Sequence, residues 1–201
     1  MLGGGKMDQV TIGKHNVGRI AERIVANELE YRGFRISDLN KEGLSANADL
    51  LAAKDGKTWQ IQVKGASVVE TDNGSWVGYG FCNDEIIAGK RPMFNNKPSD
   101  FYKAQIVILV AVKSPDDYTC VVMPERIAEK AAQINLDYAF RTPKKDGSPK
   151  KPGKVWVSLV HLPKVRDASK VEPMKAEQKL ITPYINNWNI ESPAISSDSA
   201  N

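Results

Sequence analysis

The sequence predicts a single α/β domain in which helices flank a central mixed β-sheet. Three observations favour this fold class. The 201 residues suit one domain, helical periodicity and strand-like alternation take turns along the chain, and no internal repeat or linker divides it. Hydrophobic residues at 41% and charged residues at 26% exclude a wholly disordered or fibrous chain. The expected order is helix, three strands, an insertion, two strands, helix, strand and helix.

The first elements follow from periodicity and turn chemistry. Residues 16–32 have helical periodicity, with an apolar stripe that begins at Val17, and Gly33 supplies the stop. Residues 34–39 predict a short strand. The dipeptide Asp55-Gly56 separates two alternating segments, 46–53 and 58–64, which is the strongest short-range indication of a β-hairpin.

The rest of the chain alternates between strands and helices around polar segments. Residues 66–103 predict an insertion with a short helix at 83–90, and residues 104–112 and 119–123 predict a buried strand and its hairpin partner. Pro124 is expected at the first position of a helix over 124–136, and 155–162 is expected to be a strand. A last helix begins near Pro173 and is interrupted at Pro183. The predicted organisation is a flexible N-terminus over 1–14, a folded domain over 15–188 and a disordered tail over 189–201.

Apolar runs and cysteine usage indicate the compartment. The longest apolar run, residues 106–112, falls far short of the roughly 20 residues of a membrane-spanning helix. Residues 1–14 lack the apolar segment of a secretory signal. Cys82 and Cys120 are widely spaced and have no metal-ligand pattern, so we expect reduced thiols in a cytoplasmic protein.

The net charge of +4 is concentrated in one basic loop, residues 141–154, which carries six basic residues and one acid. Such a loop is either a solvated turn or an arm that contacts phosphates of nucleic acid. Three aromatic residues of the insertion, at positions 76, 79 and 81, either stack on bases or pack. The candidate phosphate contacts of the insertion and the loop are Lys90, Arg91, Lys97, Lys144, Lys145, Lys150, Lys151 and Lys154.

The predicted hairpin brings polar side chains together. If Asp55 and Gly56 form its turn, Asp49 lies opposite Gln62, with Cβ atoms about 4.5–5.5 Å apart. Because side chains alternate between faces, the polar face holds Asn47, Asp49, Gln60, Gln62 and Lys64. A carboxylate, an amide and an ammonium therefore converge, although any hairpin with one wet face also carries polar residues there.

Two acids of the first helix compete for a place beside this hairpin. Glu22 lies at the edge of the apolar stripe between Gly18 and Ala26, whose small side chains leave its carboxylate room to approach a sheet. Glu28 projects nearer the centre of the stripe. We expect Glu22 to reach the hairpin, with Glu28 as the alternative.

These segments resemble a known catalytic core. GRIAERIVANELEYRGF (18–34) followed by ADLLAAKDGKTWQIQVKGAS (48–67) resembles the PD-(D/E)XK nuclease superfamily, to which archaeal Holliday-junction resolvases belong. The helix motif falls on Gly18 and Glu22, and the strand motifs on Asp49 and Lys64. The resemblance covers residues 17–67 and implies a restriction-endonuclease-like core. Gln62 stands where the superfamily usually has an acid, a variant also found in its methylation-dependent restriction endonucleases.

The resemblance implies a Mg²⁺-dependent endonuclease acting on DNA, with Mn²⁺ as a substitute metal. Asp49, the Gln62 amide oxygen and the Val63 carbonyl would hold the metal, since Mg²⁺ prefers oxygen ligands. Glu22 would act through water or on a second metal, and Lys64 would hold the attacking water and stabilise charge on the phosphate. The formal charges of these four side chains sum to −1. We therefore expect weak metal binding without DNA and tighter binding when a DNA phosphate supplies a further negative oxygen ligand.

Several alternatives remain within and outside this class. A restriction or phage-defence nuclease suits the insertion and basic loop, whereas a junction resolvase would be a two-fold homodimer. A non-catalytic nucleic-acid-binding module would keep the fold but lack strong metal affinity, and the replacement of the usual acid by Gln62 would reflect that loss. Two histidines and the absence of a G-x-S-x-G motif argue against a His-rich zinc site and a serine hydrolase.

Overall fold

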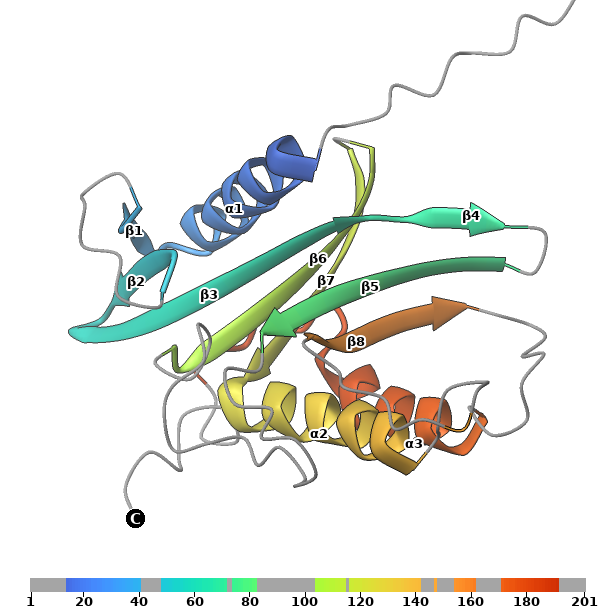
Figure 1. The fold of residues 1–201 in the computed structure, drawn as a ribbon. Coiled ribbons are helices and arrows are strands. Elements are labelled where there is room, and N and C mark those ends of the chain that lie inside the picture. Colours follow the sequence, from blue (N-terminus) through green and yellow to red (C-terminus); the bar gives the residue numbers. More distant parts are fainter. Residues whose placement is uncertain are drawn as a thin grey trace, which may run out of the picture.

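A computed structural model of the chain describes residues 14–40, 48–71, 74–82, 104–114, 116–141, 147, 154–161 and 171–191. The predicted α/β class is confirmed: a mixed five-stranded sheet has α1 on one face and α2 and α3 on the other (Figure 1). The elements are α1 Lys14–Tyr31, β1 Arg35–Asp38, β2 Leu50–Lys54, β3 Lys57–Ser67, β4 Val69–Thr71, β5 Gly74–Cys82, β6 Ile106–Ser114, β7 Asp117–Pro124, α2 Glu125–Arg141, β8 Lys154–His161, α3 Val171–Ile181 and the 3₁₀ helix η2 Thr182–Tyr184.

The main sheet has the strand order β1-β2-β3-β6-β7, with β3 at its centre. It is mixed because β3 and β6 run parallel while the other neighbours are antiparallel. In register, Ile61 of β3 faces Leu50 of β2 on one side and Ile106 of β6 on the other. β3 is therefore paired along both edges, which holds its side chains in fixed positions.

The β2–β3 hairpin closes as its sequence predicts. Asp55 and Gly56 have φ values of 49° and 74°, so both occupy the left-handed region. This is the combination that a two-residue type I′ turn requires and that Asp-Gly accommodates. Lys54 pairs with Lys57, which confirms the predicted register.

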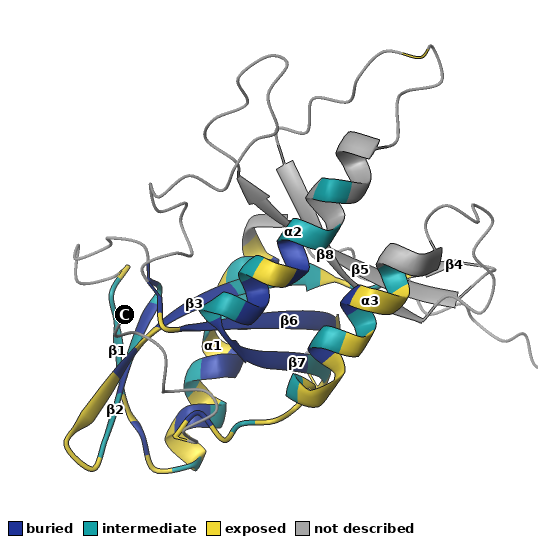
Figure 2. Ribbon diagram, turned by 90° about the horizontal axis from the view of Figure 1, so that it is seen from below, coloured by how far each residue is buried: buried dark blue, intermediate teal, exposed yellow. Residues whose placement is uncertain are grey.

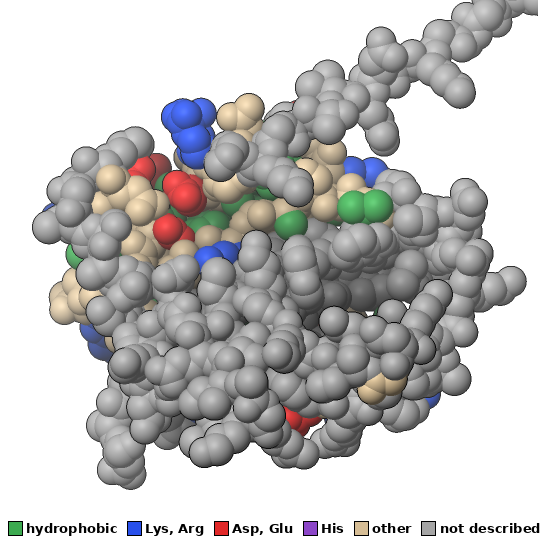
Figure 3. Space-filling model, in the orientation of Figure 1, with side chains coloured by type: hydrophobic (Ala, Val, Ile, Leu, Met, Phe, Trp, Pro, Cys, Tyr) green, Lys and Arg blue, Asp and Glu red, His purple; other side chains and the backbone are tan. Residues whose placement is uncertain are grey.

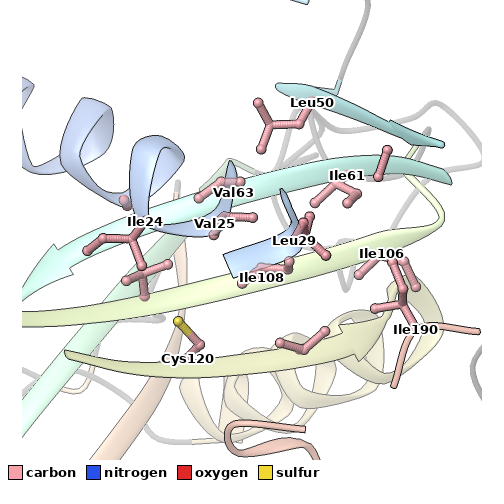
Figure 4. Close-up of a cluster of buried hydrophobic side chains, with 14 of the residues drawn as sticks. Ile24, Val25, Leu29, Leu50, Ile61, Val63, Ile106, Ile108, Cys120 and Ile190 are labelled. Carbon is pink, nitrogen blue, oxygen red and sulfur yellow. The ribbon is translucent and has the colours of Figure 1, made fainter. Parts of the chain in front are cut away.

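Helix α1 packs closely on β3. Its buried residues Val25 and Leu29 lie against Ile61 and Val63 of the strand (Figure 4). Gly65 allows the closest approach, because a Cβ atom there would lie 2.5 Å from the Ala21 Cβ and 2.8 Å from the Val17 carbonyl oxygen. The position of α1 over the sheet therefore depends on a glycine near the C-terminal end of β3.

A second core lies on the opposite face of the sheet. β6 is buried on both of its faces, and Figure 2, seen from the side of α2 and α3, shows β6 and β7 buried beneath these helices. The buried residues of this core are Val107, Leu109, Ala111, Val121, Met123, Ile127, Ala128, Ala131, Ala132 and Ile181. Continuous apolar runs such as β6 are typical of strands covered on both faces.

A second sheet of three strands, in the order β4-β5-β8, was not foreseen. The segment 66–103, expected to be an insertion, supplies β4 and β5, and β5 pairs antiparallel with the distant β8. The strands predicted at 34–39, 104–112, 119–123 and 155–162 are confirmed as β1, β6, β7 and β8. The short helix predicted at 83–90 lies outside the described residues.

Three predicted boundaries need correction. Pro124 is the last, buried residue of β7, so α2 begins at Glu125; a proline is tolerated at a strand end, where its missing N–H removes no interior ladder bond. The last helix begins at Val171, before Pro173. The tail expected to be disordered from residue 189 instead contributes Ile190, which is fully buried in the α1 core. Among the described residues, no helix is long and apolar enough to cross a membrane.

Candidate active site on the β2–β3 hairpin

The backbone of Asp49 is fixed before β2 begins. Its N–H donates to the Ile61 carbonyl at 2.9 Å, and its carbonyl accepts the Leu39 N–H at 3.0 Å. Asp49 is therefore held between the end of β1 and the middle of β3. The hairpin geometry places its side chain opposite Gln62, as predicted.

The Asp49 carboxylate is held by three hydrogen bonds. Its Oδ2 accepts the Val63 N–H at 2.7 Å and also the side-chain amide of Gln62. Its Oδ1 accepts the Asn40 side-chain amide at 3.2 Å. Asp49 thus has a single well-defined orientation, while half-burial leaves the carboxylate within reach of solvent.

Gln62 is a buried polar residue in the centre of the sheet, with 6% of its surface exposed. Its Nε2 donates to Asp49 Oδ2 and lies 3.5 Å from the Val63 carbonyl oxygen. These two oxygens are the ones that the sequence predicts as metal ligands. The amide nitrogen therefore stands between the two oxygens and supplies the positive end of a dipole to them.

Lys64 follows on the same face of β3. Gln62 and Lys64 lie beside Val107 and Leu109 of β6, and both of these belong to the core on the α2 side. Lys64 is half-buried, and its ammonium makes no ion pair or hydrogen bond with the part of the chain that the structure describes. Its charge is thus available to a ligand beside Asp49.

Glu22 lies in a different environment from the one expected. It lines a cleft of about 600 Å³ between α1 and the β1–β2 edge, on the α1 side of the sheet. Asn40 lines the same cleft and donates to Asp49. The sequence expected Glu22 to reach the hairpin side chains directly, whereas the structure places it in this cleft, whose lining includes Asn40 but not Asp49, Gln62 or Lys64.

The alternative acid, Glu28, is engaged elsewhere. It accepts the Tyr118 hydroxyl at 2.7 Å and pairs with Arg32. Burial alone would raise the pKa of Glu28, but the hydrogen bonds from Tyr118 and Arg32 lower it below its ordinary value. Because Tyr118 lies on β7, at the opposite edge of the sheet from β1, Glu28 is a structural acid and is not beside the hairpin site.

Two residues of this region were missed from the sequence. Asp38, the last residue of β1, faces Leu50 in register and lines the cleft with Glu22. Asn40, two residues later, is a partner of Asp49. The alternation of Ile36 with Asp38 would have placed Asp38 on the α1 face, but the turn that brings Asn40 back to Asp49 has no sequence signature.

The described surface also shows where charges gather. In Figure 3 acidic side chains cluster between α1 and β1, with basic side chains above and below them. The cleft contributes Glu22, Glu30 and Asp38 to the acidic residues of this region. Of the predicted phosphate contacts, Lys154 begins β8 and pairs with Cys82; the positions 90, 91, 97, 144, 145, 150 and 151 lie outside the described residues.

Comparisons with known proteins include a likeness to a solved structure. No family model matches the sequence, and no curated protein does so either. A bacterial homing endonuclease, I-Ssp6803I, is similar in structure with a TM-score of 0.39 and 10% sequence identity, over 86% of this chain and 94% of that chain.

Proposed function

We propose that this protein is a metal-dependent endonuclease that hydrolyses phosphodiester bonds of DNA at the β2–β3 hairpin. One observation carries the proposal: the Asp49 carboxylate is fixed against Gln62 and Val63, with the unpaired ammonium of Lys64 on the same face of β3 among the described residues. Preorganised charge of this kind is what stabilises charge that develops on a reacting phosphate.

The donor set fits a hard cation such as Mg²⁺, with Mn²⁺ as a substitute. If the Gln62 amide turns over, its oxygen replaces the nitrogen beside Asp49 Oδ2 and the Val63 carbonyl, and the two ends of an amide differ little in size. Three oxygens would then face one point, which suits Mg²⁺. Among the described residues no group of three His, Cys, Asp or Glu side chains is placed to hold a metal ion, and the proposed donors are one carboxylate, one amide oxygen and one backbone carbonyl. Affinity without DNA is therefore expected to be weak.

Each residue has a separate role in this proposal. A bound metal would lower the pKa of a coordinated water and polarise the phosphate. Lys64 would orient the attacking water and offset charge on the phosphate oxygens, while the Val63 N–H keeps Asp49 in place. Glu22, which lines the neighbouring cleft with Asn40, would act through an intervening water or on a second metal.

The test compares plasmid nicking in Mg²⁺, in Mn²⁺ and in EDTA. Wild type is expected to cut only with metal, and Asp49→Asn and Lys64→Ala to lose about 100-fold or more of that activity. Gln62→Glu adds a carboxylate next to Asp49 and should tighten metal binding while retaining or raising cleavage. Gln60→Glu is the matched control, because Gln60 is an exposed glutamine two residues earlier on the same strand face. Equal cutting by all the variants would refute the proposal.

A second candidate function is a non-catalytic DNA-binding module that retains the fold. The observation that favours it is the hydrogen bond from Gln62 to Asp49, because an amide donor satisfies that carboxylate without any metal. In this case wild type binds DNA without cutting it, and Gln62→Glu gains metal-dependent cleavage that Gln60→Glu does not.

A further inference from the structure

The outer side of α1 carries two arginines at the cleft between α1 and β1. Arg19 and Arg23 are both exposed, and both line this cleft together with Glu22. They are one helical turn apart, so their Cα atoms are separated by about 6 Å along the helix axis. They therefore form a pair of guanidinium groups on one rim of the cleft.

These two groups are not used within the described fold. Neither Arg19 nor Arg23 forms an ion pair or hydrogen bond with the residues that the structure describes, although Glu22, Glu30 and Asp38 line the same cleft. Arg32, by contrast, pairs with the Glu28 carboxylate and donates to the Glu28 carbonyl. Arginine also remains charged at any physiological pH and presents a fork of N–H donors that matches phosphate oxygens.

The cleft meets the proposed active site at one residue, Asn40. Asn40 forms part of its wall and donates to the Asp49 carboxylate. A strand that lies along α1 therefore passes Asn40 before it reaches Asp49. The acidic residues deeper in the cleft repel phosphates, so the backbone of such a strand would be held at the rim, where the two guanidinium groups lie.

We propose that Arg19 and Arg23 bind two phosphates of the DNA strand that leads into the Asp49 site, with the cleft between α1 and β1 as its path. This inference rests on DNA as the substrate of the proposed function. The contacts are to the backbone, so they position the strand and do not read its sequence.

The experiment measures DNA binding by fluorescence anisotropy in EDTA, with the full chain and a labelled duplex, over a series of salt concentrations. Each lost phosphate contact reduces the slope of log K against log salt by about 0.9. Arg19→Ala with Arg23→Ala should therefore lower the slope by about 1.8 and weaken binding at every salt concentration. Arg19→Lys with Arg23→Lys keeps both positive charges and should keep the slope. Thermal unfolding is expected to change little, because both side chains are exposed and alanine favours helix.

Lys175→Ala with Lys179→Ala is the matched control, since these exposed residues are also one turn apart, on α3 across the sheet. An unchanged slope for the α1 variant, or an equal fall for the α3 variant, overturns the inference. If wild type binds DNA and the arginine variant lowers the slope, but wild type never cuts DNA, the proposed endonuclease function is wrong while the role of the two arginines stands. If wild type does not bind DNA at all, both are wrong.

Discussion

Replacing Gly65 with alanine tests whether α1 must lie as close to β3 as the structure places it. The new Cβ atom would be 2.5 Å from the Ala21 Cβ and 2.8 Å from the Val17 carbonyl oxygen. Comfortable contacts between carbon atoms are about 3.5–4.0 Å, so the gap is short by about 1 Å. Both atoms belong rigidly to the helix, so no rotamer change relieves the clash and α1 itself has to move. Overpacking of this kind costs about 1–3 kcal/mol.

Urea unfolding followed by circular dichroism measures the free energy of unfolding of this variant. Gly18→Ala is the matched control in the same helix, because nothing lies within 4 Å of a Cβ atom at Gly18. That control should be more stable than wild type by about 0.5–1 kcal/mol, since glycine is unfavourable inside a helix. If Gly65→Ala unfolds at the same urea concentration as wild type, the close approach of α1 to β3 is wrong.

The remaining predictions concern pH. Burial alone would raise the pKa of Glu28, but hydrogen bonds from Tyr118 and Arg32 lower it below its ordinary value of 4.5. Ionised Glu28 therefore stabilises the fold above pH 4.5, and this contribution is lost as the pH falls through the lowered pKa. Glu28→Gln should therefore be less stable than wild type at pH 7, with a difference that shrinks toward pH 3 in chemical denaturation; a constant difference would contradict this. Burial, with repulsion from Glu129, raises the pKa of Glu125 to about 7, so ionising it destabilises the fold as the pH rises from 4.5 to 7. Glu125→Gln should melt at a higher temperature than wild type at pH 8 and at nearly the same temperature at pH 4, and equal melting at both values would exclude this role of burial.

The hairpin was the most predictable part of the molecule. Asp55-Gly56 specifies a two-residue turn, and such a turn fixes every pair along the two strands. The contact between Asp49 and Gln62 follows from that register alone. The local sequence was therefore sufficient to predict that Asp49 and Gln62 lie side by side at the centre of the candidate site.

The surroundings of the site could not be predicted in the same way. Asn40 reaches Asp49 through a turn without a distinctive sequence, and the position of Glu22 depends on how α1 lies across the sheet. The pairing of β5 with β8 joins segments far apart in the chain, and no local pattern encodes such a partner. Ile190 and Trp188 both pack on the core, but polar residues surround them in the sequence and no helical or strand periodicity marks them as buried.

The parallel pairing of β3 with β6 has a consequence for the order of folding. The β2–β3 and β6–β7 hairpins join near neighbours in the chain, whereas residues 68–105 have to be made before β3 meets β6. Contacts between distant segments form late, because the entropy of closing the loop is lost before the contacts between the strands can offset it. During synthesis one edge of β3 is thus open to other chains, and unprotected strand edges promote aggregation. Gln60, Gln62 and Lys64 interrupt the apolar residues along that strand, so the polar side chains of the candidate site would also keep the nascent chain from associating through it.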